Sequence, residues 1–161
     1  MTLNLIRINQ HELDSFLNDP SLLEDFLDND DENANQINID KSWGGILFLL
    51  TGGTYNDSHP SNRIFFSCNF IDEEQDLGYG PAHYLTKDEV SIYAKELSAI
   101  NLEDLKNNFD PLKMDAIGVY PGNWERDGEE ERTYLIEYFE ELRSFYLAAA
   151  QKEQAILTFI G

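Results

Sequence analysis

The stretch Asp76–Val90 reads D-L-G-Y-G-P-A-H-Y-L-T-K-D-E-V, and the rest of the chain is organised around it. Two glycines and a proline at its start permit a tight, irregular backbone, because glycine adopts left-handed conformations and proline fixes its own φ. Thr86 can cap a helix, and Glu89 three residues later can reach back to the backbone N–H of the capping residue. The stretch therefore predicts a rigid loop that leads directly into a helix.

Beyond this stretch the pattern is mainly helical. The Thr86 helix is followed by two short helices that begin at Asn101 and Asp110, the second with a proline in its first turn. The longest helix runs from Glu129 to about Gln151, with apolar residues at the helical period and acids in its first turn, where the helix dipole favours them. The chain closes with Ala155–Ile160, which predicts a strand.

Before the stretch, the N-terminal part predicts one strand and two helices. The alternating residues Thr2–Ile8 are typical of a short strand. The apolar spacing that follows predicts a helix from Asn9 or Gln10 to Pro20, and then a second short helix capped by Ser21.

A third helix is predicted at Lys41–Leu50, with Asp40 as its cap. Apolar residues occupy both of its sides, so we expect it to be central and nearly all buried, and Gly52 supplies the left-handed residue that ends it. Arg63–Phe70 is rich in β-forming residues and predicts a strand, although a buried helical turn fits the same run. With no internal repeat or linker, residues 1–161 predict a single domain of the α+β class.

The composition is strongly acidic, with 31 Asp and Glu against 11 Lys and Arg, a net charge of −20 and a pI near 4.2. A surface this negative repels nucleic acid and anionic lipid, and it attracts cations and basic proteins. The acids gather in two predicted loops, around residues 24–32 and 72–76. We therefore expect a basic protein partner, no nucleic acid, no membrane, and a chain that is monomeric on its own because like charges repel.

The cytoplasm is the expected compartment. Met1–Asn9 lacks the basic start and long apolar run of a signal peptide, and no apolar stretch approaches the roughly 20 residues that span a bilayer. The only cysteine, Cys68, has no second cysteine with which to form an internal disulfide.

No catalytic or cofactor-binding motif is present, and we expect neither catalysis nor a cofactor. His11, His59 and His83 lie far apart and form none of the short spacings of zinc sites. Cys68 could act as a nucleophile with His83 as its base, but a small thiol buried among the neighbouring phenylalanines is the commoner arrangement.

The acidic run from Asp28 invites comparison with a calcium loop. Asp28, Asp30 and Glu32 occupy alternating positions at the start of such a loop. However, Asn33 stands where the loop needs glycine, and Ile39 stands where it needs a bidentate glutamate. We therefore expect a solvated acidic loop and no metal site.

Aromatic residues flank the irregular loops, with a histidine among them. Most of these side chains should belong to the core. The set from which a small-molecule pocket would be built is Trp43, Tyr79, His83, Tyr120 and Trp124. A pocket at the Gly78–His83 loop is the alternative hypothesis, which makes the chain a small-molecule-binding protein or an enzyme of unknown reaction.

Several motifs occur in one order along the chain, namely Ile39–Trp43 opening a helix that ends at Leu50–Gly52, Gly78–Pro81 with Tyr84–Thr86, Phe109–Pro111, Val119–Pro121 and Ala155–Thr158. In this ordered set the chain resembles the YfbM-like family, a bacterial domain of unknown function. The resemblance implies a small α+β fold with a mixed sheet flanked by helices, and it implies no reaction. The resemblance implies His or Asp after the helix-opening tryptophan and a further His or aromatic residue later in that helix. This chain has Gly44, Leu47 and Phe48 at these positions, which weakens an enzymatic interpretation.

The charge and the absence of a catalytic set favour a non-catalytic, acidic protein-binding module. The most concrete version is an immunity protein that neutralises a basic, nuclease-like bacterial toxin, because an acidic loop can occupy a site built for phosphates. The residues expected to contact such a partner are Asp28, Asp30, Asp31, Asp72, Glu73 and Glu74.

Overall fold

A β-sheet at the centre of the molecule brings the two ends of the chain together. The computed structural model describes residues 1–29 and 35–161. In these residues the sheet has four strands in the order β2-β1-β4-β3. The strands are β1 (Leu3–Ile8), β2 (Gln36–Asn38), β3 (His83–Leu85) and β4 (Ala155–Ile160).

All strand pairs in this part of the chain are antiparallel, where a mixed sheet was expected. The central strands β1 and β4 pair along the whole of their length. Because side chains alternate across a strand, Leu5 and Ile156 join a larger hydrophobic cluster on one face, and Ile6 and Leu157 join a smaller one on the other. Both faces of the sheet are therefore covered, which explains the nearly continuous apolar run of the last strand.

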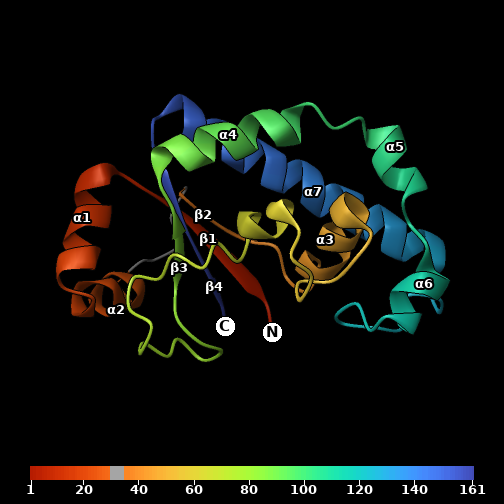
Figure 1. Cartoon of the computed structure of the whole chain (residues 1–161), viewed down its shortest axis with the longest axis horizontal. Helices are drawn as coiled ribbons and strands as arrows, with labels where there is room; N and C mark the ends of the chain where they lie inside the picture. The colour runs from red at the N-terminus through yellow and green to blue at the C-terminus, as the bar shows by residue number, and fades with distance from the viewer. Residues whose placement is uncertain (30–34) are drawn as a thin grey trace.

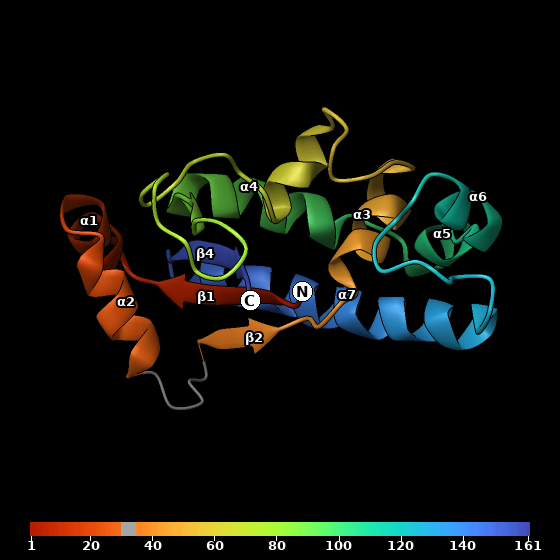
Figure 2. The ribbon, with the colours of Figure 1, turned by 90° about the horizontal axis from the view of Figure 1, so that it is seen from below.

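Helices cover the sheet and extend beyond it on one side. They are α1 (Gln10–Asn18), α2 (Ser21–Asp28), α3 (Trp43–Thr51), the 3-10 helix η1 (Pro60–Ile64), α4 (Lys87–Ser98), α5 (Leu102–Asn107), α6 (Pro111–Ala116) and α7 (Gly128–Gln151). In Figures 1 and 2, α1 and α2 lie at one end of the molecule and α5 and α6 at the other, while α4 runs beside α7. Within the described ranges, none of these helices has the length and apolar character needed to cross a membrane.

The predicted α+β class and the long C-terminal helix followed by a final strand are confirmed. The predicted capping box of α4 is also present: the Thr86 hydroxyl accepts the Glu89 N–H, and the Glu89 carboxylate accepts the Thr86 N–H at 2.9 Å. Gly52 ends α3 with a φ of 74°, as its position predicted. These elements were predictable because the cap, the apolar stripe and the stop signal all agree in the sequence.

Two predicted helix caps are wrong. Asp40 has a φ of 48° and does not cap α3, which begins only at Trp43. The Asp40 carboxylate instead accepts a hydrogen bond from the Tyr134 hydroxyl at 3.0 Å, so a distant helix uses the side chain that was assigned to the cap. Ser21 is the first residue of α2, and its N–H and hydroxyl donate to the Asp19 carboxylate.

The strand predicted at Arg63–Phe70 is also wrong, and the helical alternative fits its first part. Ile64 and Phe65 are consecutive and both buried in the larger cluster, which a half-buried strand does not allow. The chain forms η1 there and contributes only one isolated bridge, between Phe70 and His83. Cys68 then adopts a φ of 62° and is exposed, so the expected buried thiol is not found.

Two adjacent glycines let α3 pack unusually close to its neighbours. A Cβ on Gly44 would overlap the carbonyl oxygen of Tyr120. A Cβ on Gly45 would lie 2.6 Å from a methyl carbon of Leu135 and 2.7 Å from the Trp124 ring. The position where a polar group was expected therefore carries glycine for a packing reason, because no side chain fits between α3 and the Tyr120 segment.

Candidate functional site

Five aromatic side chains form a continuous row beside the sheet, which we call the aromatic row. Tyr120 stacks on Trp43 with 4.8 Å between ring centroids and an interplanar angle of 17°. Phe66 meets Trp43 edge-on at 5.5 Å and His83 at 5.7 Å, and His83 meets Phe70 at 4.7 Å. The structure thus brings together Trp43, His83 and Tyr120 from the predicted pocket set.

The remaining two residues of that set lie differently. Tyr79 is 61% exposed in the loop before β3. Burial, with the Asp40 carboxylate and Tyr79 nearby, raises the pKa of Tyr120, so Tyr79 lies close to that end of the row. Trp124 is 1% exposed and donates its indole N–H to the Val119 carbonyl at 2.9 Å, so it is a core residue outside the row.

Hydrogen bonds fix the row at both ends. The Tyr120 hydroxyl donates to the Met1 carbonyl at 3.0 Å, and the Trp43 indole N–H donates to the same oxygen at 3.4 Å. At the other end, the imidazole Nδ1 of His83 accepts the backbone N–H of Cys68 at 3.2 Å. The row is therefore held as a structural unit between the N-terminus and β3.

The contact between His83 and Cys68 does not form a nucleophile–base pair. Burial lowers the pKa of His83, which favours the neutral imidazole. Its Nδ1 accepts the amide of Cys68, and that nitrogen is therefore not free to take the proton of the thiol. The two residues meet through the backbone, and this arrangement holds the turn at Cys68 in place.

A second region joins the two predicted acidic segments at one end of the molecule. Gln75 is 7% exposed, and its side-chain amide donates to the Glu24 carboxylate at 3.3 Å. This bond ties α2 to the turn at residues 72–76. We call α1, α2 and the loop at residues 71–82 the acidic end (Figure 1).

A small hydrophobic cluster lies beneath the acidic end. Leu13, Phe16 and Leu23 from the two helices pack with Ile71 and Ala82 from the loop. The acidic residues therefore project from a fixed base rather than from separate loops. Neither the cluster nor the Gln75 contact was visible in the sequence, because the pairing joins residues that are about fifty positions apart.

The predicted partner-binding residues lie at this end as far as the structure describes them. Asp28, Glu73 and Glu74 are exposed. Asp72 is half-buried, and its carboxylate accepts the Glu74 N–H at 3.0 Å. It therefore holds the turn in shape and also adds negative charge to it. Asp30 and Asp31 lie outside the described residues.

No Lys or Arg interrupts the acidic end. The sequence from residue 8 to 40 and from residue 64 to 86 contains neither Lys nor Arg. Among the ion pairs that join two described residues, none involves α1, α2 or the loop at residues 71–82. The negative charge there is consequently not neutralised by protein cations of these ranges.

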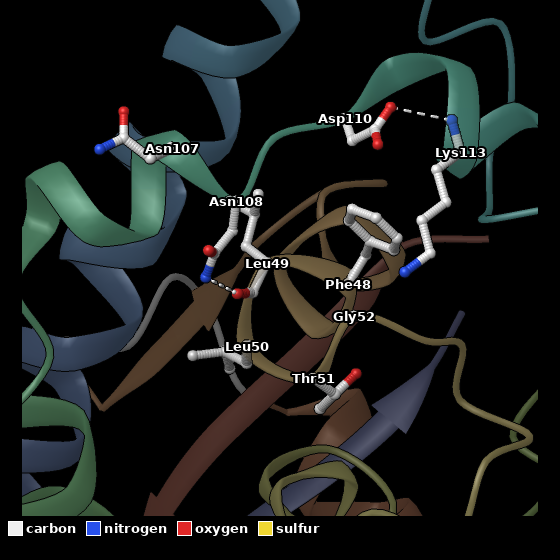
Figure 3. A pocket seen from close by; sticks show the side chains of 9 residues that line it. All are labelled: Phe48, Leu49, Leu50, Thr51, Gly52, Asn107, Asn108, Asp110 and Lys113. Atoms are coloured by element: carbon white, nitrogen blue, oxygen red, sulfur yellow. Dashed lines mark hydrogen bonds between the residues drawn. The ribbon is translucent and has the colours of Figure 1, made fainter.

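A hollow of about 430 Å³ lies between the C-terminus of α3 and the helices α5 and α6 (Figure 3). Asn108 donates its side-chain amide to the Leu49 carbonyl at 2.8 Å, and Asp110 caps α6 by accepting the Lys113 N–H at 3.0 Å. The Lys113 ammonium lies 5.5 Å from the centroid of the Phe48 ring. The side chains of Asn108 and Asp110 each serve a helix end, which is a structural role.

Metal ligands do not gather in the described part of the chain. There, no group of three or more His, Cys, Asp or Glu side chains is arranged to hold a metal ion.

Known proteins share the fold of this chain. No curated protein matches it. Among solved structures, it is similar to a protein of unknown function, YfbM from Escherichia coli, with a TM-score of 0.78, 18% identity and 98% of each chain covered, and at that identity the likeness shows the fold alone. A family described as a domain of unknown function, DUF1877, matches residues 1–159. The resemblance drawn from the sequence motifs is therefore confirmed, and the chain belongs to this YfbM-like family.

Proposed function

We propose that the chain is a non-catalytic, cytoplasmic module that binds a basic protein through its acidic end. The observation that carries this proposal is the contact of Gln75 with Glu24, which joins two acidic segments that lack Lys and Arg into one surface. Asp28, Glu73 and Glu74 are its exposed residues.

The distribution of charge supports a role in binding. Surface ion pairs form readily and add little stability, and several of them lie elsewhere on the molecule. Carboxylates that are gathered without such partners repel one another, and a folded protein gains nothing in stability from that arrangement. A basic partner would remove the repulsion and be drawn in by the field, which speeds association.

The most concrete form of the proposal is an immunity protein for a nuclease-like toxin. A nuclease binds phosphates through a cationic surface, and a fixed array of carboxylates is complementary to such a surface. Inhibition of this kind needs no catalytic group on the inhibitor.

The test compares two triple variants with the same change in net charge. The first carries Asp28→Lys, Glu73→Lys and Glu74→Lys. The control carries Glu96→Lys, Glu137→Lys and Glu141→Lys, three exposed glutamates on α4 and α7. Each tagged chain is immobilised, exposed to native cell lysate, washed at low and then at high salt, and the bound proteins are identified by mass spectrometry.

We expect the original chain and the control to retain the same basic protein at low salt and to release it at high salt, because the attraction is screened. The acidic-end variant should retain little of it. If both variants bind equally, the charge of the whole chain and not the acidic end is responsible, and the proposal fails. For the immunity protein in particular, the captured protein must be a nuclease whose activity falls when the original chain is added.

A further inference from the structure

An apolar hollow of about 440 Å³ lies between α1 and α2 within the acidic end. The residues that line it are His11, Glu12, Ser15, Phe16, Leu22, Asp25, Phe26 and Asn29. The rings of Phe16 and Phe26 meet at its floor with 5.4 Å between their centroids. Leu22 is 41% exposed although it is a large apolar residue.

The fold uses only part of this apolar surface. A helix packs on a core through one apolar stripe, and α2 already uses Leu23, which is fully buried. Phe26 packs, partly buried, against the same small cluster, whereas Leu22 is exposed and faces the hollow. Leu22 therefore leaves apolar surface between polar side chains, which an apolar side chain of a partner can cover.

The rim of the hollow is negative. Glu12 and His11 lie on the α1 side and Asp25 on the α2 side, and the sequence from residue 8 to 40 has no Lys or Arg to balance the two carboxylates. One Glu12 oxygen accepts the Asn9 N–H, which holds this carboxylate at the start of α1. An apolar floor between carboxylates complements an apolar side chain that is flanked by basic ones.

We propose that this hollow receives a basic amphipathic helix of the partner protein, with an apolar anchor over Leu22 and Phe26 and Lys or Arg beside Glu12 and Asp25. The inference rests on the proposed function and names the kind of segment that the acidic end recognises. Amphipathic helices are bound in this way when their apolar residues fill a groove and their charges meet its rim.

The probes are two synthetic peptides of Leu and Lys with identical composition. One has leucines at helical spacing and therefore an apolar face, and the other has the same residues permuted so that no face forms. Binding is followed by fluorescence anisotropy of the labelled peptides. We expect the amphipathic peptide to bind the original chain about tenfold more tightly than the permuted one.

Two leucine variants locate the binding. Leu22→Gln keeps a good helix former and should abolish most of the tenfold preference. Leu147→Gln is the control, because Leu147 is 37% exposed and lies in another hollow, between α4 and α7. It should leave the preference unchanged, and thermal unfolding of both variants confirms that they remain folded.

Binding at the hollow and binding through the charge of the acidic end predict different results in these measurements. Equal binding of both peptides, or a preference that Leu22→Gln leaves intact, overturns the hollow as the docking site. In that case the proposed function still stands if Asp28→Lys, Glu73→Lys and Glu74→Lys together weaken both peptides. If neither the peptides nor the captured basic protein responds to those reversals, both proposals fail.

Discussion

The two ends of the molecule differ in their ion pairs. At the end with α5 and the start of α7, Lys106 pairs with Glu103 at 2.9 Å and Arg126 with Asp127 at 2.7 Å (Figure 1). At the acidic end, by contrast, the described residues form no ion pair with each other or with the rest of the described chain. Both ends are surface, so solvent exposure does not explain the difference. The two ends therefore differ in whether their described carboxylates have a cationic partner.

The hydrophobic packing differs in the same direction. The larger cluster contains α3, α4 and α7 with both tryptophans, whereas the cluster under the acidic end is small and leaves apolar surface open between α1 and α2. If the stability of the chain resides in the larger cluster, changes there should be the most costly.

The largest effect is expected from Gly44→Ala. The new methyl group would overlap the Tyr120 carbonyl oxygen and force α3 away from its neighbours. Overpacking of this kind costs about 3 kcal/mol of unfolding free energy. Denaturant titration measures the loss, and Gly128→Ala is the control because nothing lies within 4 Å of a Cβ at that position.

Gly128→Ala should change the unfolding free energy by at most about 0.5 kcal/mol, and in the stabilising direction, since alanine is the better helix former. A similar small effect of Gly44→Ala would mean that α3 can move without cost. The larger cluster would then not be the rigid part of the molecule, and the expected difference in packing between the two clusters would be wrong.

An intermediate effect is expected from Glu89→Gln. Burial alone raises the pKa of Glu89, but hydrogen bonds from the Thr86 N–H and from Arg63 outweigh it and hold the pKa below its usual range. The bond with the Arg63 guanidinium is 2.6 Å long and ties η1 to α4. At neutral pH the substitution should cost about 1 kcal/mol of unfolding free energy, because the ion pair with Arg63 is lost and the capping acceptor becomes neutral.

The cost of Glu89→Gln should depend on pH in one direction. Because the folded state favours the carboxylate, the unfolded chain binds more protons in the acidic range, and the stabilisation is complete only above the ordinary glutamate pKa of about 4.3. It is lost as pH falls through the lower pKa of the folded state. The difference between the two chains, measured by urea titration from pH 7 downward, should therefore shrink below about pH 4. A difference that stays constant would show that Glu89 acts without its charge.

A matched control for this variant is Glu103→Gln. Its carboxylate pairs with Lys106 on the surface and is 77% exposed. Exposed pairs of this kind contribute roughly 0.3 kcal/mol, so the expected cost is near the limit of measurement. An equal cost for both variants would contradict the view that partial burial makes the Glu89 pair the stronger one.

The parts of the fold that were predictable from the sequence are those fixed by local signals. Thr86 with Glu89 marked the start of α4, and the long apolar period marked α7. β2 and β3 were missed because each has only three residues and exists only through pairing with a central strand. Asp40 was misread because its carboxylate serves Tyr134, which is ninety-four positions away.

The candidate site was likewise only partly predictable from the sequence. Exposed acids such as Glu73 and Glu74 could be named from composition, since a run of acids is rarely buried. Their juxtaposition with α2 depends on one contact of Gln75, and the hollow depends on how α1 and α2 cross, so no local pattern contains either. Trp124 was placed in the pocket set because of its position after a turn, but its indole fills the space that Gly45 leaves.

The smallest effect on stability is expected from charge reversal at the acidic end. If the acids at the acidic end repel one another without compensation, then Asp28→Lys, Glu73→Lys and Glu74→Lys together should raise the unfolding free energy by about 0.5 to 1 kcal/mol at low salt. Reversal at Glu96, Glu137 and Glu141 relieves the same net charge and should give a smaller gain. The difference between the two variants should fade as salt is added.

This outcome would tie stability to binding. A variant that becomes more stable while it loses its basic partner shows that the same carboxylates both repel one another and hold the partner. The opposite result, a larger gain for the control than for the acidic end, would mean that the charge at α1 and α2 is already compensated within the folded chain. Thermal unfolding of the two variants at low and high salt decides between these results.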